Sequence, residues 1–196
     1  MCFSTPGFGT PQKYAEADLY TGYLAGLSAI IYYIESMWRP VALLCDRLAH
    51  QFLFTGVNVY LTPAGGNVAL PPHTDEQDVF LLQISGSKRW LVFPPPYEVD
   101  IYKEHVIGKP HSRRRFQKVK VKSLGSPELN FTMRQGDVLY IPRGHPHYAV
   151  SLPDELSMHL TITVGPHLSA SLHALALPLP FVCMLCWSVT QHRLSD

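Results

Sequence analysis

The chain has 196 residues and a formal net charge of +1 at pH 7, and 46% of its residues are apolar. This length suits one domain with a buried core, and the near-neutral charge excludes the strongly basic character of a general nucleic-acid binder. With 17 Pro and 13 Gly between short apolar segments, the composition favours many strands and turns over long helices.

The cysteines, the N-terminus and the apolar runs indicate the cellular compartment in which the protein is expected. Four Cys in a chain of this size do not form the pattern of a disulfide framework, which favours a reducing intracellular environment. The N-terminus has no basic region followed by an apolar one, so we expect no signal peptide and no secretion. The longest apolar run, 172–187, is short for a bilayer and holds Pro178 and Pro180, so we expect no membrane helix.

The first third of the chain combines a weakly structured start with one helix. Residues 1–22 are polar and rich in Gly and Pro, which predicts a poorly ordered N-terminal segment. Residues 23–33 have the composition of a strand. Apolar residues recur at near-helical spacing over 35–52, which predicts a helix with Pro40 in its first turn, where proline is tolerated.

The middle of the chain reads as short strands separated by turns. Strands are predicted at 57–62, 78–84, 88–93, 118–122, 131–134, 138–141 and 157–164. The turn Ser85-Gly86-Ser87 predicts a hairpin that pairs the second of these strands with the third. Together they predict a mainly β protein with a closed or sandwiched architecture and a few flanking helices.

The strand pattern sets the expected domain boundaries. We expect the barrel to occupy residues 23–165. No Asp, Glu, Lys or Arg occurs between Leu156 and His192, and the strand and turn pattern ends after Gly165. Residues 166–196 are therefore an apolar C-terminal tail to which the sequence assigns no structure.

His73 and Asp75 are the first candidate metal ligands in the sequence. Residues two apart on a strand point to the same face, so this imidazole and this carboxylate are expected side by side. A second imidazole from His145 or His147 would complete a 2-His-1-carboxylate triad. Such a triad suits non-haem Fe(II) and leaves coordination positions open for a co-substrate and oxygen.

Lys88 begins the predicted strand at 88–93, which follows the His73/Asp75 pair and the apolar strand at 78–84. A Lys on the inner wall of a barrel can bind the distal carboxylate of 2-oxoglutarate as a compact charge. The alternative is a solvated Lys on a hairpin, and the residue type alone favours that alternative.

Several motifs resemble those of the JmjC-type ribosomal oxygenases, also called bifunctional lysine-specific demethylases and histidyl-hydroxylases. In chain order they lie at residues 58–63, 73–75, 80–83, 86–90, 136–147 and 157–161. They include His73-Thr74-Asp75, the run from Gly86 to Trp90, and Pro142-Arg143-Gly144 with His147 three residues later. The resemblance runs from about residue 23 to residue 164 and implies a mainly β double-stranded β-helix, the JmjC jelly roll of the cupin type, with a few flanking helices.

The resemblance also implies roles for individual residues. It implies that the metal ligands and catalytic residues are His73, Asp75 and His147, which selects His147 over His145. It implies 2-oxoglutarate contacts at Lys88, Asn58 and Ser157 and a substrate contact at Tyr60.

The implied activity is that of an Fe(II)- and 2-oxoglutarate-dependent dioxygenase that uses O2 to hydroxylate a protein substrate. The implied reactions are histidyl hydroxylation of a ribosomal protein and lysine demethylation of a histone tail, in the nucleus or nucleolus, or otherwise in the cytoplasm. The alternatives are a non-oxygenase metal-binding cupin and a catalytically inactive truncated relative. The helical dimerisation region and winged-helix domain of the family are not recognised after the barrel.

A basic cluster at Arg113–Arg115 is followed by three alternating lysines, Lys118, Lys120 and Lys122. Such a cluster can contact RNA or chromatin. A solvated strand face explains the alternation equally well and is the commoner case, so no direct nucleic-acid contact is predicted.

Overall fold

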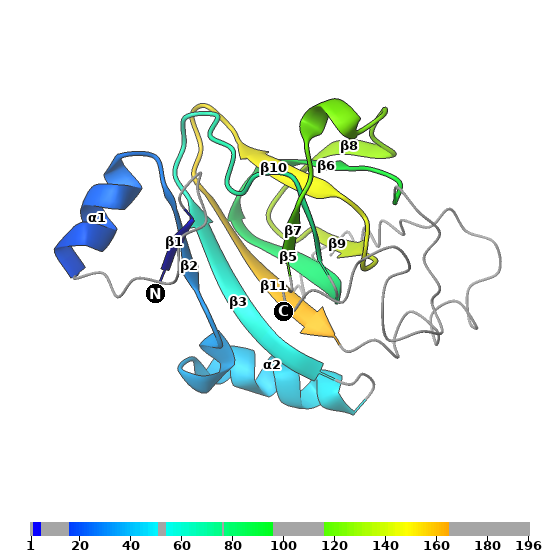
Figure 1. Ribbon diagram of the computed structural model, residues 1–196. Helices are drawn as coiled ribbons and strands as arrows, with labels where there is room; N and C mark the ends of the chain where they lie inside the picture. The colour runs from blue at the N-terminus through cyan, green and yellow to red at the C-terminus, as the bar shows by residue number, and fades with distance from the viewer. Residues whose placement is uncertain (1, 5–15, 51–53, 76, 96–115, 165–196) are drawn as a thin grey trace, which may run out of the picture.

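The structure is a computed structural model that describes residues 2–4, 16–50, 54–75, 77–95 and 116–164. The described strands form two antiparallel sheets, and the few helices lie outside them (Figure 1). No helix in these ranges is long and apolar enough to cross a membrane. The predicted tail at 166–196 and most of the basic cluster lie outside the described residues.

The larger sheet has six strands, in the order β1-β2-β3-β11-β5-β9. Their bounds are β1 Cys2–Ser4, β2 Ser28–Ile31, β3 Phe54–Thr62, β11 Ser157–Val164, β5 Asp78–Gly86 and β9 Val138–Ile141. The last strand of the described residues, β11, therefore lies between two much earlier ones, and it makes the longest pairings among them.

The smaller sheet has five strands, in the order β7-β4-β10-β6-β8. Their bounds are β7 Phe116–Lys118, β4 His73–Asp75, β10 His147–Ser151, β6 Lys88–Val92 and β8 Leu129–Met133. Neighbours in both sheets come from distant parts of the chain, as in a jelly roll. The predicted fold class, a mainly β double-stranded β-helix with few helices, is confirmed.

The helices lie outside the two sheets. Their bounds are α1 Glu16–Leu24, α2 Arg39–Ala49 and two short 3-10 turns, η1 Ile34–Ser36 and η2 Val121–Ser123. Helix α2 confirms the prediction that Pro40 lies in the first turn, although the helix begins later than predicted because η1 occupies residues 34–36.

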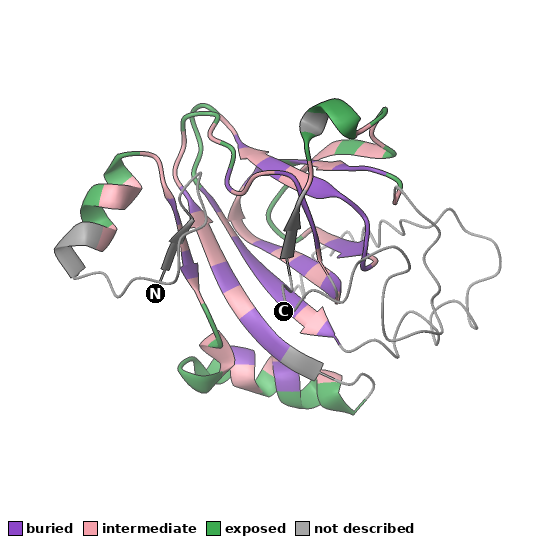
Figure 2. Cartoon of the chain, viewed as in Figure 1, coloured by how far each residue is buried: buried purple, intermediate pink, exposed green. Residues whose placement is uncertain are grey.

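Two apolar cores follow from the alternation of side chains along the strands (Figure 2). The core between the sheets consists of Val79, Leu81, Trp90, Val92, Met133, Leu139, Ile141 and Ala149. The second core lies between the larger sheet and α2 and consists of Val41, Cys45, Val57, Val59, Leu160, Ile162 and Val164. Alternate residues of β5 thus serve the two different cores, whereas β11 contributes Leu160, Ile162 and Val164 to the second core, and these burial patterns fix the register of both strands.

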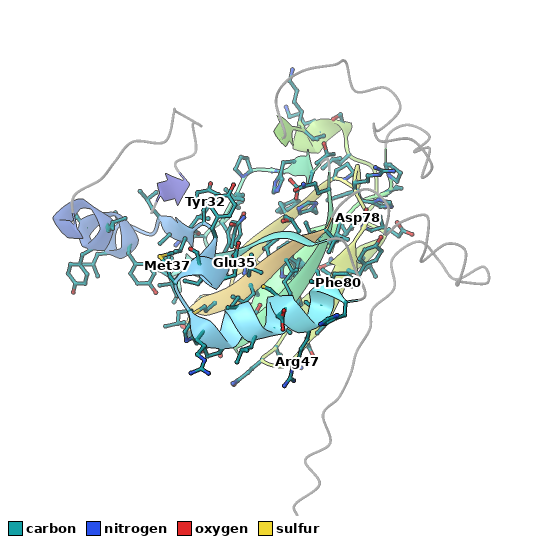
Figure 3. The ribbon with its side chains drawn as sticks, turned by 90° about the horizontal axis from the view of Figure 1, so that it is seen from below. Tyr32, Glu35, Met37, Arg47, Asp78 and Phe80 are labelled. Atoms are coloured by element: carbon teal, nitrogen blue, oxygen red, sulfur yellow. The ribbon has the colours of Figure 1, made fainter. Side chains whose placement is uncertain are left out.

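Helix α2 covers the outer face of the larger sheet (Figure 3). Val41 and Cys45 are buried against the sheet, where Phe80 of β5 packs against the same cluster, whereas Arg47 is exposed. At the start of the helical region, Glu35 accepts a hydrogen bond of 3.1 Å from the backbone N–H of Val57, which attaches η1 to β3.

The predicted hairpin between residues 78–84 and 88–93 is wrong. Strand β5 pairs with β11 and β9, and β6 pairs with β10 and β8, so the chain crosses from one sheet to the other at this turn. Gly86 has φ +62°, a left-handed conformation that turns the chain out of the larger sheet.

Two further predictions need correction. The predicted strand at 23–33 is helical up to Leu24, and only Ser28–Ile31 is extended. The alternating lysines do not form a strand over 118–122, because β7 ends at Lys118 and a 3-10 turn begins at Val121. Within residues 1–22, where the composition predicts little order, the structure has β1 and the first part of α1.

Candidate metal centre

Strands β4 and β10 bring the three predicted ligands together. His73 and Asp75 flank Thr74 on β4 and point to the same side, as their spacing predicts. His147 begins β10 and lies opposite His73 in the antiparallel register. Among the described residues, His73, Asp75 and His147 form a group whose ligand atoms all lie within 4.8 Å of one another.

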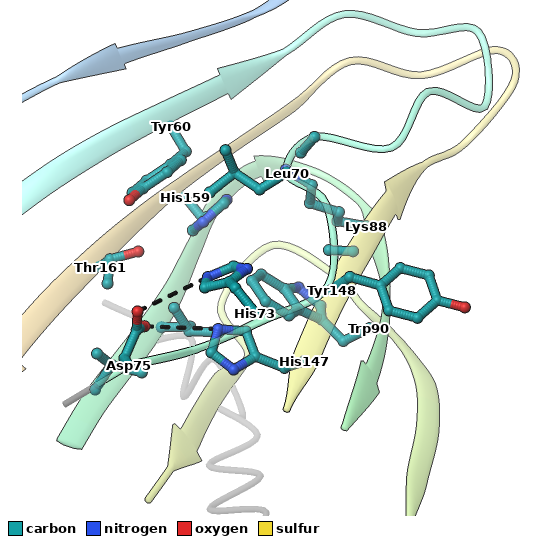
Figure 4. Close-up of a pocket in the computed structure, with 14 residues that line it drawn as sticks. Tyr60, Leu70, His73, Asp75, Lys88, Trp90, His147, Tyr148, His159 and Thr161 are labelled. Carbon is teal, nitrogen blue, oxygen red and sulfur yellow. Dashed lines mark ion pairs between the residues drawn. The ribbon is translucent and has the colours of Figure 1, made fainter. Parts of the chain in front are cut away.

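Asp75 is shared by the two imidazoles (Figure 4). Its carboxylate oxygens lie 3.8 Å from Nε2 of His73 and 3.6 Å from Nε2 of His147. Both histidines are buried, whereas the Asp75 side chain is 28% exposed. The two Nε2 atoms and the carboxylate thus face one point at the edge of the pocket.

The backbone orients both imidazoles for metal binding. Nδ1 of His73 lies 2.8 Å from the carbonyl oxygen of Pro71, and Nδ1 of His147 lies 2.9 Å from that of His145. A carbonyl oxygen only accepts hydrogen bonds, so Nδ1 is the donor in each ring, and in the neutral tautomer this leaves the lone pair on Nε2. Two Nε2 atoms oriented in this way and one carboxylate are the donor set that Fe(II) takes in this kind of triad, and the residues therefore fit that metal.

His145, the alternative to His147, is not part of this group. Its Nδ1 is buried and has no hydrogen-bond partner in the described part of the chain. Burial lowers the pKa of His145 to about 4, so the ring is neutral at physiological pH. The structure therefore favours His147 as the second imidazole ligand.

A glycine turn holds β10 against β4. Gly144 has φ +81°, which favours glycine, and its N–H donates to the carbonyl oxygen of Asp75 at 2.9 Å. The N–H of the preceding Arg143 donates to the Asp78 carboxylate at 2.8 Å. This turn gives a structural reason for the Pro-Arg-Gly segment before His147.

A pocket opens beside the three ligands, between the two sheets. Its lining residues are Tyr60, Ala69, Leu70, His73, Asp75, Val79, Leu81, Lys88, Trp90, His147, Tyr148, Ala149, His159 and Thr161. Figure 4 shows Tyr60 and His159 on one wall and His73 and His147 on the other. The lining is largely apolar and has a few polar groups, which is typical of a small-molecule site.

Lys88 lies on the pocket wall and is fully buried, so the solvated alternative is wrong. Its Nζ donates to Oγ1 of Thr62 at 2.7 Å, and Thr62 also accepts a hydrogen bond of 3.0 Å from Ser28. Burial lowers the pKa of Lys88 to about 7. An anionic ligand in this pocket would meet a cation that already has a fixed position.

The remaining predicted residues divide into two groups. Tyr60 lines the pocket, and burial, with a smaller effect of the Asp75 charge, raises its pKa far above the ordinary value. Asn58 and Ser157 are not among the lining residues that the structure describes. Instead, Asn58 accepts a hydrogen bond from the N–H of Tyr33 at 3.3 Å, and Ser157 accepts one from Gln83 at 2.8 Å.

Sequence reasoning assigned no role to His159, Thr161, Trp90 or Tyr148, all of which line the pocket. A signal for His159 and Thr161 was present, because strand alternation from Ser157 puts residues 157, 159 and 161 on one face. Trp90 follows from the same rule, since it lies two residues after Lys88.

Comparisons with known proteins show which family the chain resembles. The JmjC domain family matches residues 34–172. Ribosomal oxygenase 2 of Rattus norvegicus is 41% identical over 132 residues, which cover 66% of this chain and 24% of that protein. The bifunctional lysine-specific demethylase and histidyl-hydroxylase NO66 of Dictyostelium discoideum is 36% identical over 130 residues, or 66% of this chain and 23% of that protein. The chain thus spans about a quarter of the length of these curated relatives.

The fold is also similar to that of a solved structure. The Escherichia coli protein ycfD superimposes with a TM-score of 0.53 at 21% sequence identity, over 69% of this chain and 33% of that one. At this identity the likeness concerns the fold alone.

Proposed function

Because the chain belongs to the JmjC-domain family, we propose that it is an Fe(II)- and 2-oxoglutarate-dependent dioxygenase that oxidises a protein side chain. The observation that carries this proposal is the arrangement of His73, Asp75 and His147, in which two carbonyl-oriented imidazoles and one carboxylate face a single point. Their positions on two paired strands keep this arrangement independent of a flexible loop.

The residues of the chain have separate tasks in this reaction. His73, Asp75 and His147 would hold Fe(II), and Lys88 would bind the distal carboxylate of 2-oxoglutarate. Fe(II), when bound with 2-oxoglutarate and O2, would supply the oxidising power for C–H hydroxylation, with succinate and CO2 as the co-products. The apolar lining of the pocket, including Leu81 and Ala149, excludes water from the reacting groups.

Succinate formation tests the reaction class. The wild type, Asp75→Ala and Asp154→Ala are incubated with Fe(II), ascorbate, O2 and 2-oxoglutarate, and succinate is measured. Asp154 is an exposed carboxylate away from the pocket, so its variant controls for the loss of a charge. We expect succinate from the wild type and Asp154→Ala and none from Asp75→Ala. A folded, iron-loaded wild type that forms no succinate would contradict the proposal.

We further propose that the substrate is a histidine of a ribosomal protein, with an N-methyl-lysine of a histone tail as the second substrate. The names of the curated relatives support both reactions. Mass spectrometry of peptides from both sources separates them. Histidyl hydroxylation adds one oxygen atom to the peptide, whereas demethylation removes a methyl group and releases formaldehyde. A chain that forms succinate but modifies neither peptide class would contradict this assignment.

We propose the nucleus or nucleolus as the site of action, since ribosomal proteins and histones meet there. Imaging of the tagged full-length protein tests this proposal, and exclusion from the nucleus would contradict it.

A further inference from the structure

His159 differs from the other two histidines of the pocket in its hydrogen bonding. Nδ1 of His73 and Nδ1 of His147 are each held by a backbone carbonyl. Nδ1 of His159 is buried and has no hydrogen-bond partner among the described residues, although the side chain is only 2% exposed. An unpaired buried polar group is unfavourable by about 1–3 kcal/mol, so such a ring in a ligand pocket points to a partner that arrives with the ligand.

The ring of His159 is nevertheless firmly positioned. It stacks on Tyr60 with ring centroids 4.9 Å apart and an interplanar angle of 8°. It also meets Trp90 at an angle of 82° with centroids 5.3 Å apart. Two aromatic contacts therefore fix the plane of the ring while its Nδ1 has no partner among the described residues, which is the arrangement of a preorganised binding group.

The register of the larger sheet places His159 near Lys88. His159 lies opposite Tyr60, and Ser157, two residues earlier, lies opposite Thr62, the residue that holds the Lys88 ammonium. Figure 4 shows His159 on the pocket wall between the Asp75 end and the Lys88 end. Burial and the positive charge of Lys88 hold the pKa of His159 well below its ordinary value, so the ring is neutral and carries one N–H.

We propose that His159 is a co-substrate-binding residue that donates a ring N–H to the distal carboxylate of 2-oxoglutarate, beside Lys88. This inference rests on the proposed function. A carboxylate at this end accepts hydrogen bonds from Lys88 and from His159 together, and it neutralises the buried cation. A carboxylate has about four acceptor positions, so one ligand group satisfies both side chains.

The test compares two ligands that differ at the distal carboxylate. 2-Oxoglutarate has this carboxylate, whereas 2-oxobutyrate keeps the keto acid end and lacks it. Binding of each ligand to the Fe(II)-loaded full chain is measured by calorimetry without oxygen, so that no turnover occurs. The variants are His159→Phe, which keeps an aromatic ring without nitrogens, and His159→Gln, which keeps an N–H donor. Met158→Leu changes the adjacent residue of β11, which faces away from the pocket, and serves as the control.

We expect His159→Phe to bind 2-oxoglutarate about tenfold to a hundredfold more weakly than the wild type, while its affinity for 2-oxobutyrate stays unchanged. His159→Gln should recover part of the loss, and Met158→Leu should bind as the wild type does. Melting temperatures of all variants establish that each one is folded.

Three outcomes would overturn the inference. Equal 2-oxoglutarate affinities of the wild type and His159→Phe would show that the ring makes no contact with the ligand. Equal losses for both ligands would show that the ring only shapes the pocket. A wild type that binds neither ligand would remove the proposed function itself, and the inference with it.

Discussion

Among single residues, Lys88 shows most clearly how a group that serves ligand binding can lower the stability of the fold. It is fully buried, and its hydrogen-bond partner is the hydroxyl group of Thr62, a neutral group. A buried charge without an anionic partner destabilises a fold. The same charge favours the binding of a carboxylate, so the pocket binds an anion at the expense of the free protein's stability.

Replacing Lys88 by Met is expected to stabilise the protein and abolish 2-oxoglutarate binding. Burial lowers the pKa of Lys88 to about 7 from 10.5. Between these values the unfolded chain binds more protons than the native state, so native stability rises with pH there. The unfavourable effect of Lys88 is therefore greatest at and below pH 7. Lys88→Met should raise the free energy of unfolding by about 1–3 kcal/mol at pH 7.

Urea unfolding of the wild type and Lys88→Met measures this difference, which should shrink as the pH is raised towards 10.5. Lys122→Met makes the same substitution at an exposed lysine and should change stability by less than about 0.5 kcal/mol. A Lys88→Met variant that is less stable than the wild type at pH 7 would contradict the prediction.

For single residues, the sequence predicts which side chains of one strand share a face. It does not predict which side chains of other strands join them in the site. The spacing of His73 and Asp75 correctly predicts a shared face. The sequence alone leaves His145 and His147 open, because the choice depends on which ring the paired strand presents to Asp75. His159 goes unassigned because its partners, Tyr60 and Trp90, come from two other strands.

At the scale of elements, the turn between β5 and β6 decides how the chain moves between sheets. Gly86 lies in the left-handed region, and a Cβ atom added there would overlap the carbonyl oxygen of Leu156. The sequence marks a turn at this point, but a hairpin and a crossing between sheets carry the same local signal. Only the pairing of β5 with the distant β11 distinguishes them, so the predicted hairpin is wrong while the predicted bounds of β9 and β11 are confirmed.

Gly86→Ala is expected to destabilise the protein more than Gly136→Ala does. Both glycines have positive φ, +62° and +92°, so both variants acquire backbone strain of about 1–2 kcal/mol. At Gly136 the added Cβ meets no atom within 4 Å, whereas at Gly86 it also displaces the backbone at Leu156. Chemical denaturation of both variants measures the difference, and equal losses would show that the Leu156 segment shifts without resistance.

Helix α2 is expected to stabilise the larger sheet through its inner face alone. Val41 is 3% exposed and packs in the second core, whereas Leu43, two residues later, is 51% exposed. Val41→Ala should lower the free energy of unfolding by about 1–3 kcal/mol, and Leu43→Ala by less than about 0.5 kcal/mol. Both values come from denaturant titration. A larger loss at Leu43 would mean that its outer face is covered in the folded protein.

At the scale of the whole molecule, the metal centre lies at the weakest junction of the smaller sheet. Strand β10 pairs with β6 through five residue pairs but with β4 through one, His147 with His73. Strand β7 pairs with β4, so both strands join this sheet through that single ladder pair and the hydrogen bond from Gly144 to the Asp75 carbonyl oxygen. A metal ion held by His73, Asp75 and His147 would add a further link between β4 and β10.

Loading with Fe(II) is therefore expected to stabilise the whole protein. A ligand that binds only the native state at about 100 times its Kd adds about 2.7 kcal/mol, which corresponds to a rise in Tm of roughly 5–10 °C for a chain of this size. Thermal melts without oxygen should show this rise for the wild type and Asp154→Ala, and a chelator should reverse it. Amide hydrogen exchange in β4 should slow on loading. An equal rise in Asp75→Ala would mean that the metal binds elsewhere and that the junction between β4 and β10 is held by the protein alone.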